Sequence, residues 1–197
     1  MCGLTQAEQA RELDRMGVDY LGFIFWSPSS RSCPLENLPE TSAKKVGVFV
    51  NATLEEITAK AHQIDVVQLH GNEAVNLAET LKAQTGLEVW KAVGIGEQQD
   101  VEKVKKWVGK VDRILLDSKG EMPGGNGVQF DWNWLQDLGN LQPILAGGIG
   151  VDHASTLRQK QGLHAVDINS KFETEPGVKD LERVKKFIQD LRNNNGK

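Results

Sequence analysis

Short apolar runs recur along this chain, and most of the segments between them have the spacing of an amphipathic helix. The runs are rich in Val, Ile and Leu and show little strict alternation of apolar and polar residues. Strands buried on both faces of a parallel sheet have this pattern. We therefore predict seven strands, at Tyr20–Phe25, Lys45–Val50, Val66–His70, Val89–Gly94, Arg113–Asp117, Pro143–Gly148 and Ala165–Asn169.

Helix signals lie between these runs. Thr5 is followed by Glu8 and Thr53 by Glu56, which is the spacing of a capping box at a helix start. Gly86 is placed to end a helix in the left-handed conformation, and Asp131 is placed to cap a short one. The predicted helices are Thr5–Met16, Thr53–His62, Ala74–Thr85, Glu97–Val108, Trp132–Leu138 and Asp180–Arg192.

Strands that alternate with helices predict an α/β fold, a (β/α)8 TIM barrel that forms one domain over residues 1–197. Three runs end in polar or glycine residues: VQLHG at Val67–Gly71, RILLDS at Arg113–Ser118 and PILAGG at Pro143–Gly148. Barrel enzymes place their chemistry at the carboxyl ends of the strands. The sequence therefore predicts an active site at that end.

The eighth strand of such a barrel should come first in the chain, yet only Met1 precedes Cys2. We therefore expect a truncated first strand that leaves unpaired edges on its neighbours. Residues so close to a chain end should be poorly ordered, and we expect this of Met1–Gly3. A version with about five more residues, roughly one strand, should then be the more active one.

Composition narrows the classes of partner. The net charge of -4 argues against nucleic acid, which needs a basic surface, but allows a local phosphate site built from backbone N–H groups. No apolar run is long enough to span a membrane, and no export signal is visible, so we expect a cytoplasmic protein. Cys2 and Cys33 should then be reduced thiols. The spacing of the histidines gives no metal site.

A series of motifs runs through nearly the whole chain in order and resembles the phosphoribosylanthranilate isomerase family of tryptophan biosynthesis. QLHG, GG-x-G-x-x-FDW and N-S…PG-x-KD form the most specific part of this series. The motifs are CGLT at Cys2–Thr5, VGVFVN at Val46–Asn51, VVQLHG at Val66–Gly71, LLDS at Leu115–Ser118, GGNGVQFDW at Gly124–Trp132, LAGGI at Leu145–Ile149 and the stretch Asp167–Asp180.

The resemblance implies an Amadori rearrangement of N-(5-phosphoribosyl)anthranilate, an aminoaldose, to the corresponding aminoketose, with no cofactor or metal. It implies Cys2 as the general base and Asp117 as the general acid. A thiol acts as a base only when ionised, so its pKa must be lowered, and the helix that starts near Thr5 would help. The acid must instead be held protonated by an enclosed site.

The same resemblance implies the substrate-binding residues. Arg31 would hold the anthranilate carboxylate, although two serines separate it from Pro28 where the family has a shorter spacing. The phosphate would lie between two turns that follow the last two strands. Gly124–Gly127 would form a flap that closes over the substrate. The predicted binding residues are Arg31, His70, Gly147, Gly148, Asp167, Asn169 and Ser170.

Two other functions stay open at this point. The chain could be another phosphate-binding barrel isomerase or epimerase, but such enzymes use paired aspartates or metal-binding histidines, which this sequence does not offer. It could also be an inactive barrel that only binds phosphorylated ligands, which the short first strand favours. The expected partner is in each case a small phosphorylated molecule, and the chain itself would be a monomer or homodimer.

Overall fold

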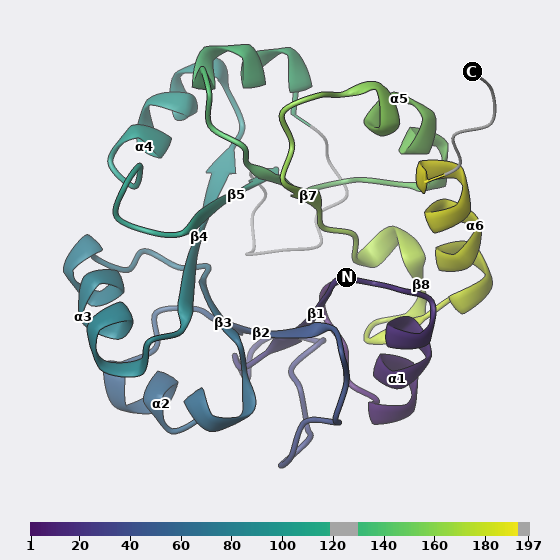
Figure 1. Cartoon of the computed structure of the whole chain (residues 1–197), viewed down its shortest axis with the longest axis horizontal. Coiled ribbons are helices and arrows are strands. Elements are labelled where there is room, and N and C mark those ends of the chain that lie inside the picture. Colours follow the sequence, from purple (N-terminus) through teal and green to yellow (C-terminus); the bar gives the residue numbers. More distant parts are fainter. Residues whose placement is uncertain (119–129, 193–197) are drawn as a thin grey trace.

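Seven parallel strands in sequence order form the centre of the structure, a computed structural model that describes residues 1–118 and 130–192. Figure 1 shows these strands around the centre with the helices outside them. The strands are β1 (Tyr20–Ile24), β2 (Lys44–Phe49), β3 (Val66–Leu69), β4 (Glu88–Ile95), β5 (Arg113–Ser118), β6 (Ile144–Leu145) and β7 (Ala165–Val166). All seven predicted strands are therefore confirmed.

The helices alternate with the strands, as the sequence predicts. They are α1 (Ala7–Arg15), α2 (Leu54–Thr58), α3 (Val75–Thr85), α4 (Glu102–Lys105), α5 (Ala154–Gln159) and α6 (Leu181–Arg192). Short 3₁₀ helices span Ala61–Gln63, Gln98–Val101, Trp132–Leu138, Val151–His153 and Ser170–Phe172. A hairpin of β8 (Glu173–Glu175) and β9 (Val178–Lys179) precedes α6. No helix in the described residues is long and apolar enough to cross a membrane.

The strands separate two apolar clusters because successive side chains point to opposite faces. On β2, Val46 and Val48 belong to the inner cluster with Cys2 and Trp90, whereas Phe49 belongs to the outer one. The outer cluster packs the strands against the helices and is the larger of the two. The inner cluster lies inside the barrel, and Cys2, Val48 and Ala146 of this cluster also line the site described below.

The first residues of the chain correct one expectation. Met1 and Cys2 are buried, and they lie between β1 and the segment after β7. Cys2 N–H donates to the carbonyl of Ile168 at 3.0 Å, and Gly22 N–H on β1 donates to the carbonyl of Met1 at 2.8 Å. A Cβ at Gly22 would lie 3.0 Å from the Cys2 Cα, so glycine permits this close approach. The truncated first strand is confirmed, since the sheet has seven strands, but the expected frayed terminus is wrong, and the edges are not unpaired where Met1 and Cys2 bond to them.

The helix boundaries show which local signals hold. The capping box at Thr53 and Glu56 is confirmed, as are the left-handed Gly86 and the Asp131 cap, which accepts from Asn133 N–H at 2.9 Å. The Thr5 cap is wrong: the Thr5 hydroxyl donates to the Gly177 carbonyl at 2.8 Å, and α1 starts after Gln6 instead. The hydroxyl that would have capped α1 is instead bonded to the turn of the β8–β9 hairpin.

Several predicted elements are shorter in the structure. The helix that starts after Thr53 ends at Thr58, and the stretch expected at Glu97–Val108 is divided into a 3₁₀ helix and α4. β6 stops at Leu145 because Gly147 and Gly148 turn the chain with φ of 86° and 64°. A Cβ at Gly147 would collide with Ser118, so this turn lies directly against the end of β5.

Candidate active site

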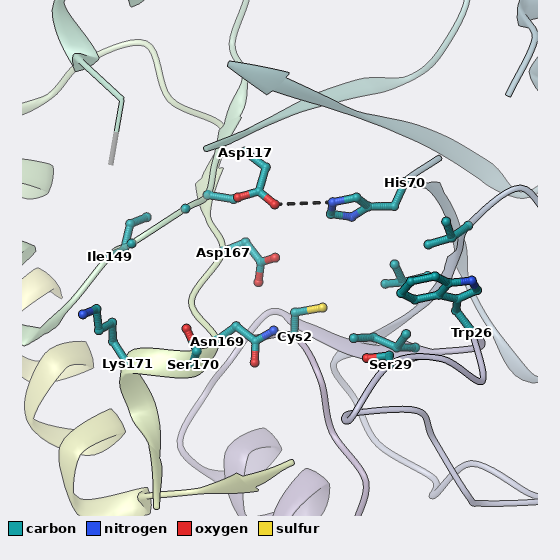
Figure 2. A pocket seen from close by; sticks show the side chains of 16 residues that line it. Cys2, Trp26, Ser29, His70, Asp117, Ile149, Asp167, Asn169, Ser170 and Lys171 are labelled. Carbon is teal, nitrogen blue, oxygen red and sulfur yellow. Dashed lines mark ion pairs between the residues drawn. The ribbon is translucent and has the colours of Figure 1, made fainter. Parts of the chain in front are cut away.

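One pocket opens at the carboxyl ends of the strands, which is where the sequence predicts the chemistry (Figure 2). It brings together eight of the nine residues that the sequence predicts for the site. They come from the start of the chain and from the ends of β3, β5, β6 and β7: Cys2, His70, Asp117, Gly147, Gly148, Asp167, Asn169 and Ser170. Only Arg31 is not among the residues that line this pocket.

Asp117 lies near the end of β5 and faces His70 across the pocket (Figure 2). His70 Nε2 is 3.3 Å from Asp117 Oδ2. The other ring nitrogen of His70, Nδ1, is 3.1 Å from the amide nitrogen of Gln68, a buried side chain of β3. One carboxylate oxygen of Asp117, Oδ2, thus lies next to His70, and the side chain of Asp117 lines the pocket.

Cys2 lies in the same pocket, and its electrostatics contradict an expectation. Burial raises the pKa of the Cys2 thiol to about 12, and the carboxylate of Asp167 adds to the rise. Lys179 acts in the opposite direction but does not prevail. The start of α1 therefore does not produce a thiolate here, and Cys2 is a neutral thiol at neutral pH in this structure.

Asp167 lies between Cys2 and Asp117 in the view of Figure 2. Burial raises the pKa of its carboxyl, and the negative charge of Asp117 acts in the same direction. The Asp167 carboxyl and the Cys2 thiol therefore both favour the neutral form, although the Met1 ammonium lies 3.5 Å from Asp167 Oδ1 and acts against this for Asp167. A site of this kind can hold a proton donor near neutral pH.

The two turns expected to hold phosphate also line this pocket. Gly147 and Gly148 follow β6, and Asn169 and Ser170 follow β7. Lys171, which the sequence analysis missed, also lines the pocket, and its side chain extends toward Ile149 in Figure 2. An anion in this corner would meet backbone N–H groups from two strand ends and one ammonium group.

Arg31 forms a buried ion pair outside the pocket lining. Its Nε is 3.0 and 2.9 Å from the two carboxylate oxygens of Glu173, and its Nη2 is 2.8 Å from Oε2. Lys179 Nζ binds the same carboxylate at 2.6 Å and Asn169 Oδ1 at 2.7 Å. Burial alone would raise the pKa of Glu173, but the hydrogen bonds from Arg31 and Lys179 outweigh it and hold the pKa below the usual value.

Signals in the sequence could have found some of the missed residues. Gln68 lies two positions before His70 in VQLHG, so period-two alternation places both on one face of the strand. Trp26 and Ser29 line the pocket and follow β1, where barrel enzymes carry binding residues. No local signal marks Glu173 as the partner of Arg31, because 142 positions separate the two.

Other expectations have different outcomes. Cys2 and Cys33 are both free thiols in the structure. The expected flap at Gly124–Gly127 lies outside the described residues. Within residues 1–118 and 130–192, no group of three or more His, Cys, Asp and Glu side chains is placed to hold a metal ion.

Comparisons with known proteins agree on one family. The sequence profile described as N-(5'phosphoribosyl)anthranilate (PRA) isomerase matches residues 1–190. An N-(5'-phosphoribosyl)anthranilate isomerase of Parabacteroides distasonis is 38% identical over 97% of this chain and 91% of the relative. One of Erythrobacter litoralis is 37% identical over 98% of this chain and 97% of the relative.

Solved structures give the same result. The crystal structure of phosphoribosyl anthranilate isomerase from Thermotoga maritima has a TM-score of 0.87 at 32% identity, covering 98% of this chain and 97% of that one. A phosphoribosyl anthranilate isomerase in complex with reduced 1-(o-carboxyphenylamino)-1-deoxyribulose 5-phosphate has a TM-score of 0.83 at 30% identity, covering 97% and 96%.

Proposed function

This chain belongs to the N-(5'-phosphoribosyl)anthranilate isomerase family, and from that premise we propose that Asp117 is its general acid and Cys2 its general base. The protein is an isomerase of tryptophan biosynthesis that converts N-(5-phospho-β-D-ribosyl)anthranilate to 1-(2-carboxyphenylamino)-1-deoxy-D-ribulose 5-phosphate. The observation that carries the two roles is that both side chains line one pocket at the carboxyl ends of the barrel strands.

The first step opens the ribose ring. Asp117 gives its proton to the ring oxygen, the bond between that oxygen and C1 breaks, and its electron pair stays on the oxygen. The anthranilate nitrogen supplies the pair that forms a C1=N double bond, which carries a positive charge. Asp117 is placed for this step because its largely buried side chain lines the pocket beside Asp167.

The second step moves a proton from the sugar to the base. Cys2 takes the proton from C2, and the electrons of that C–H bond form the C1=C2 bond of an enolamine, which tautomerises to the ketose. The raised pKa of Cys2 in the free protein means that the thiol must first release its own proton to solvent, so that the thiolate forms in the complex. A positive charge close by favours the ionised thiol, and ring opening creates one on the substrate.

The remaining pocket residues hold the two ends of the substrate. The phosphate lies between the turns Gly147–Gly148 and Asn169–Ser170, beside Lys171. Asp167 faces the sugar, where its carboxyl can bind a hydroxyl. Arg31 remains the candidate for the anthranilate carboxylate through Nη1 and the second N–H of Nη2, because Nε–H and the other N–H of Nη2 face Glu173. His70 contacts Asp117 and borders the same space.

Substitution of the acid tests this assignment. Asp117→Asn should abolish turnover, followed as the loss of substrate fluorescence, because the amide cannot donate the proton. Product binding should stay within about tenfold, roughly 1.4 kcal/mol, since the phosphate contacts persist. Near-normal turnover of the variant would show that Asp117 is not the acid.

The two cysteines provide a matched pair for the base. Cys2→Ser should reduce kcat by about 10²–10⁴-fold, the usual contribution of a general base, because a hydroxyl is a poor one at neutral pH. Cys33 is also a free thiol but does not line the pocket, so Cys33→Ser should keep kcat. Equal losses in both variants would exclude a special role for Cys2.

A crystal grown with phosphate tests the binding site. We expect the anion between the Gly147–Gly148 turn and the Asn169–Ser170 turn, because both turns follow neighbouring strands and line one pocket, where backbone N–H groups can bind a phosphate. Ordered anions found only elsewhere would contradict the site. Activity in the fluorescence assay would also contradict the alternative that the chain is an inactive phosphate-binding barrel.

Assembly and location complete the proposal. A solved Thermotoga maritima structure is described as monomers generated from a dimeric phosphoribosylantranilate isomerase. We therefore propose a monomer or a homodimer for this chain, which light scattering after gel filtration would distinguish. The cytoplasmic location expected from the sequence stays a prediction.

A further inference from the structure

A polar chain of three side chains runs from the inside of the barrel to the pocket. Gln68 is 3% exposed and lies on β3. It is paired with Val48 on β2 and Trp90 on β4, and both of these residues belong to the inner apolar cluster. Its amide nitrogen is 3.1 Å from His70 Nδ1, and His70 Nε2 is 3.3 Å from Asp117 Oδ2. Burying a glutamine among apolar side chains costs free energy unless its amide is hydrogen-bonded. The contact with His70 therefore offsets part of this cost.

The contact with Gln68 determines which nitrogen of His70 carries the proton. A neutral imidazole has one N–H and one lone pair. The Gln68 amide N–H donates to Nδ1, so Nδ1 is the lone-pair nitrogen and the ring proton lies on Nε2. The Nε2–H group then faces Asp117 Oδ2, which lies 3.3 Å away.

This direction of hydrogen bonding matters for an acid. With the Nε2–H group directed at Oδ2 from 3.3 Å, the proton of a neutral Asp117 is favoured on Oδ1, the oxygen farther from His70 Nε2. The same Nε2–H group stabilises the carboxylate that remains after the proton has left. In the opposite tautomer, Nε2 would accept the proton of Asp117 and turn it away from the substrate.

We propose that Gln68 is a positioning residue that fixes the tautomer of His70 and thereby directs the proton of Asp117 toward the substrate. This proposal rests on the proposed role of Asp117 as the acid. Gln68 itself does not line the pocket where the substrate binds, and it acts through His70. The effect of its loss should therefore fall on kcat rather than on KM.

Nitrogen-15 NMR of the ligand-free protein tests the proposal directly, because protonated and unprotonated ring nitrogens give well-separated signals. In the unsubstituted protein, we expect His70 to carry its proton on Nε2. Gln68→Leu should give a mixture of tautomers, and Gln68→Glu, whose carboxylate only accepts, should place a proton on Nδ1. Both variants should lose about tenfold or more in kcat, with KM within about threefold.

Two controls separate this role from packing. Gln63→Leu removes another glutamine with two hydrogen bonds, to Leu38 N–H and the Glu36 carbonyl, and should change neither kcat nor the His70 signals. His164, whose Nε2 is 3.2 Å from the Tyr20 hydroxyl, should keep its signals in every variant. Gln68→Glu has nearly the shape of the native side chain and serves if Gln68→Leu does not fold.

Each outcome decides the proposal. A proton on Nδ1 in the unsubstituted protein would overturn it without any variant. A loss of kcat with an unchanged His70 tautomer would show that Gln68 only packs, and a changed tautomer with normal kcat would show that the tautomer does not matter. An unsubstituted protein that does not turn over the substrate would instead contradict the proposed function, while the NMR result would stand on its own.

Discussion

Two buried lysine–glutamate pairs stabilise loops at the carboxyl ends of the strands, and they differ in what else they bind. The Lys91–Glu73 pair joins β4 to the turn after β3, with Nζ 2.8 Å from the carboxylate. Lys91 also donates to the carbonyls of Leu69 and Gly71, and Glu73 accepts from the Gly71 and Asn51 N–H groups. Apart from the pair itself, these hydrogen bonds all end on backbone.

The Lys179–Glu173 pair lies in the β8–β9 hairpin and binds side chains of the site. Lys179 holds Asn169, which lines the pocket, and Glu173 holds Arg31. The positive charge of Lys179 also acts on the pKa of Cys2. The first pair therefore maintains the framework of the barrel, and the second also positions and tunes the site. Equal burial of two ion pairs does not imply an equal role, because what matters is where their remaining hydrogen bonds go.

The largest expected difference comes from removing each lysine. Lys91→Met and Lys179→Met should each lower the free energy of unfolding by about 3–5 kcal/mol, because each leaves a carboxylate buried without its ammonium partner. Only Lys179→Met should also reduce kcat/KM per folded molecule, by about a hundredfold, since Asn169 loses its anchor. Urea unfolding and kinetics corrected for the folded fraction measure both effects.

The comparison fails if Lys91→Met reduces kcat/KM per folded molecule as much as Lys179→Met does. The pair of variants is well matched, because both lysines are buried, both bond a glutamate, and both are replaced by an unbranched side chain of similar length.

Neutralising each glutamate gives a smaller effect of the same kind. Glu173→Gln should raise KM about tenfold, roughly 1.4 kcal/mol, because Arg31 loses its charged partner and Lys179, which holds Asn169, loses the carboxylate that fixes it. Glu73→Gln should leave KM unchanged. Both should lose about 1.5–3 kcal/mol of stability, the usual value for a hydrogen bond to a charged group. A KM that rises equally in both variants would contradict the distinction.

Alkylation of Cys2 tests the electrostatic part of the comparison. With a pKa of about 12, the thiolate fraction should rise about tenfold per pH unit from roughly pH 7 to 10 without a plateau, and the iodoacetamide rate should follow it. Lys179→Met should slow the reaction about threefold, because Lys179 favours the thiolate. Lys91→Met should leave the alkylation rate of Cys2 unchanged.

A Cys33→Ser background isolates the signal, since the pKa of Cys33 is also raised by burial. A plateau near neutral pH would mean that Cys2 is already ionised in the free protein and that the burial argument is wrong.

Acid stability gives the smallest effect, and here the two pairs should behave alike. Burial acts to raise the pKa of Glu73 and of Glu173, but their ion pairs and hydrogen bonds prevail, so both pKa values lie below the usual 4.5. A carboxyl with a lowered pKa stabilises the fold above pH 4.5, and this contribution is lost as the pH falls through the folded-state value. Thermal midpoints from about pH 3 to pH 7 should therefore depend less on pH in either glutamine variant. An unchanged pH dependence in both would contradict the lowered pKa values.

Local chemistry explains which predictions from the sequence are confirmed. Thr53 and Glu56 cap α2 as predicted because they are three residues apart, and Gly86 ends α3 because only its own backbone conformation is involved. The seven strands follow from apolar runs that only a covered parallel sheet can bury. Asp117, His70 and the two turns share a pocket because the ends of parallel strands meet at one edge of the barrel.

Distant contacts explain the corrections. Thr5 and Glu8 have the spacing of a capping box, but the Thr5 hydroxyl donates to the carbonyl of Gly177, 172 positions away. The Arg31 guanidinium is suited to bind a carboxylate, and it donates to the carboxylate of Glu173, 142 positions away. The first residues are not frayed because β1 and the segment after β7 both bond to them. Each outcome depends on a partner that the local sequence does not specify.

The sequence by itself determined the barrel, the family and the end of the strands where the site lies, because these depend on short-range periodicity and on residues next to strand ends. Only the tertiary structure decided the charge state of Cys2, the two partners of Glu173 and the contact of Gln68 with His70. Desolvation and hydrogen bonding depend on what surrounds a side chain in space, and in a barrel those neighbours come from strands far apart in the chain.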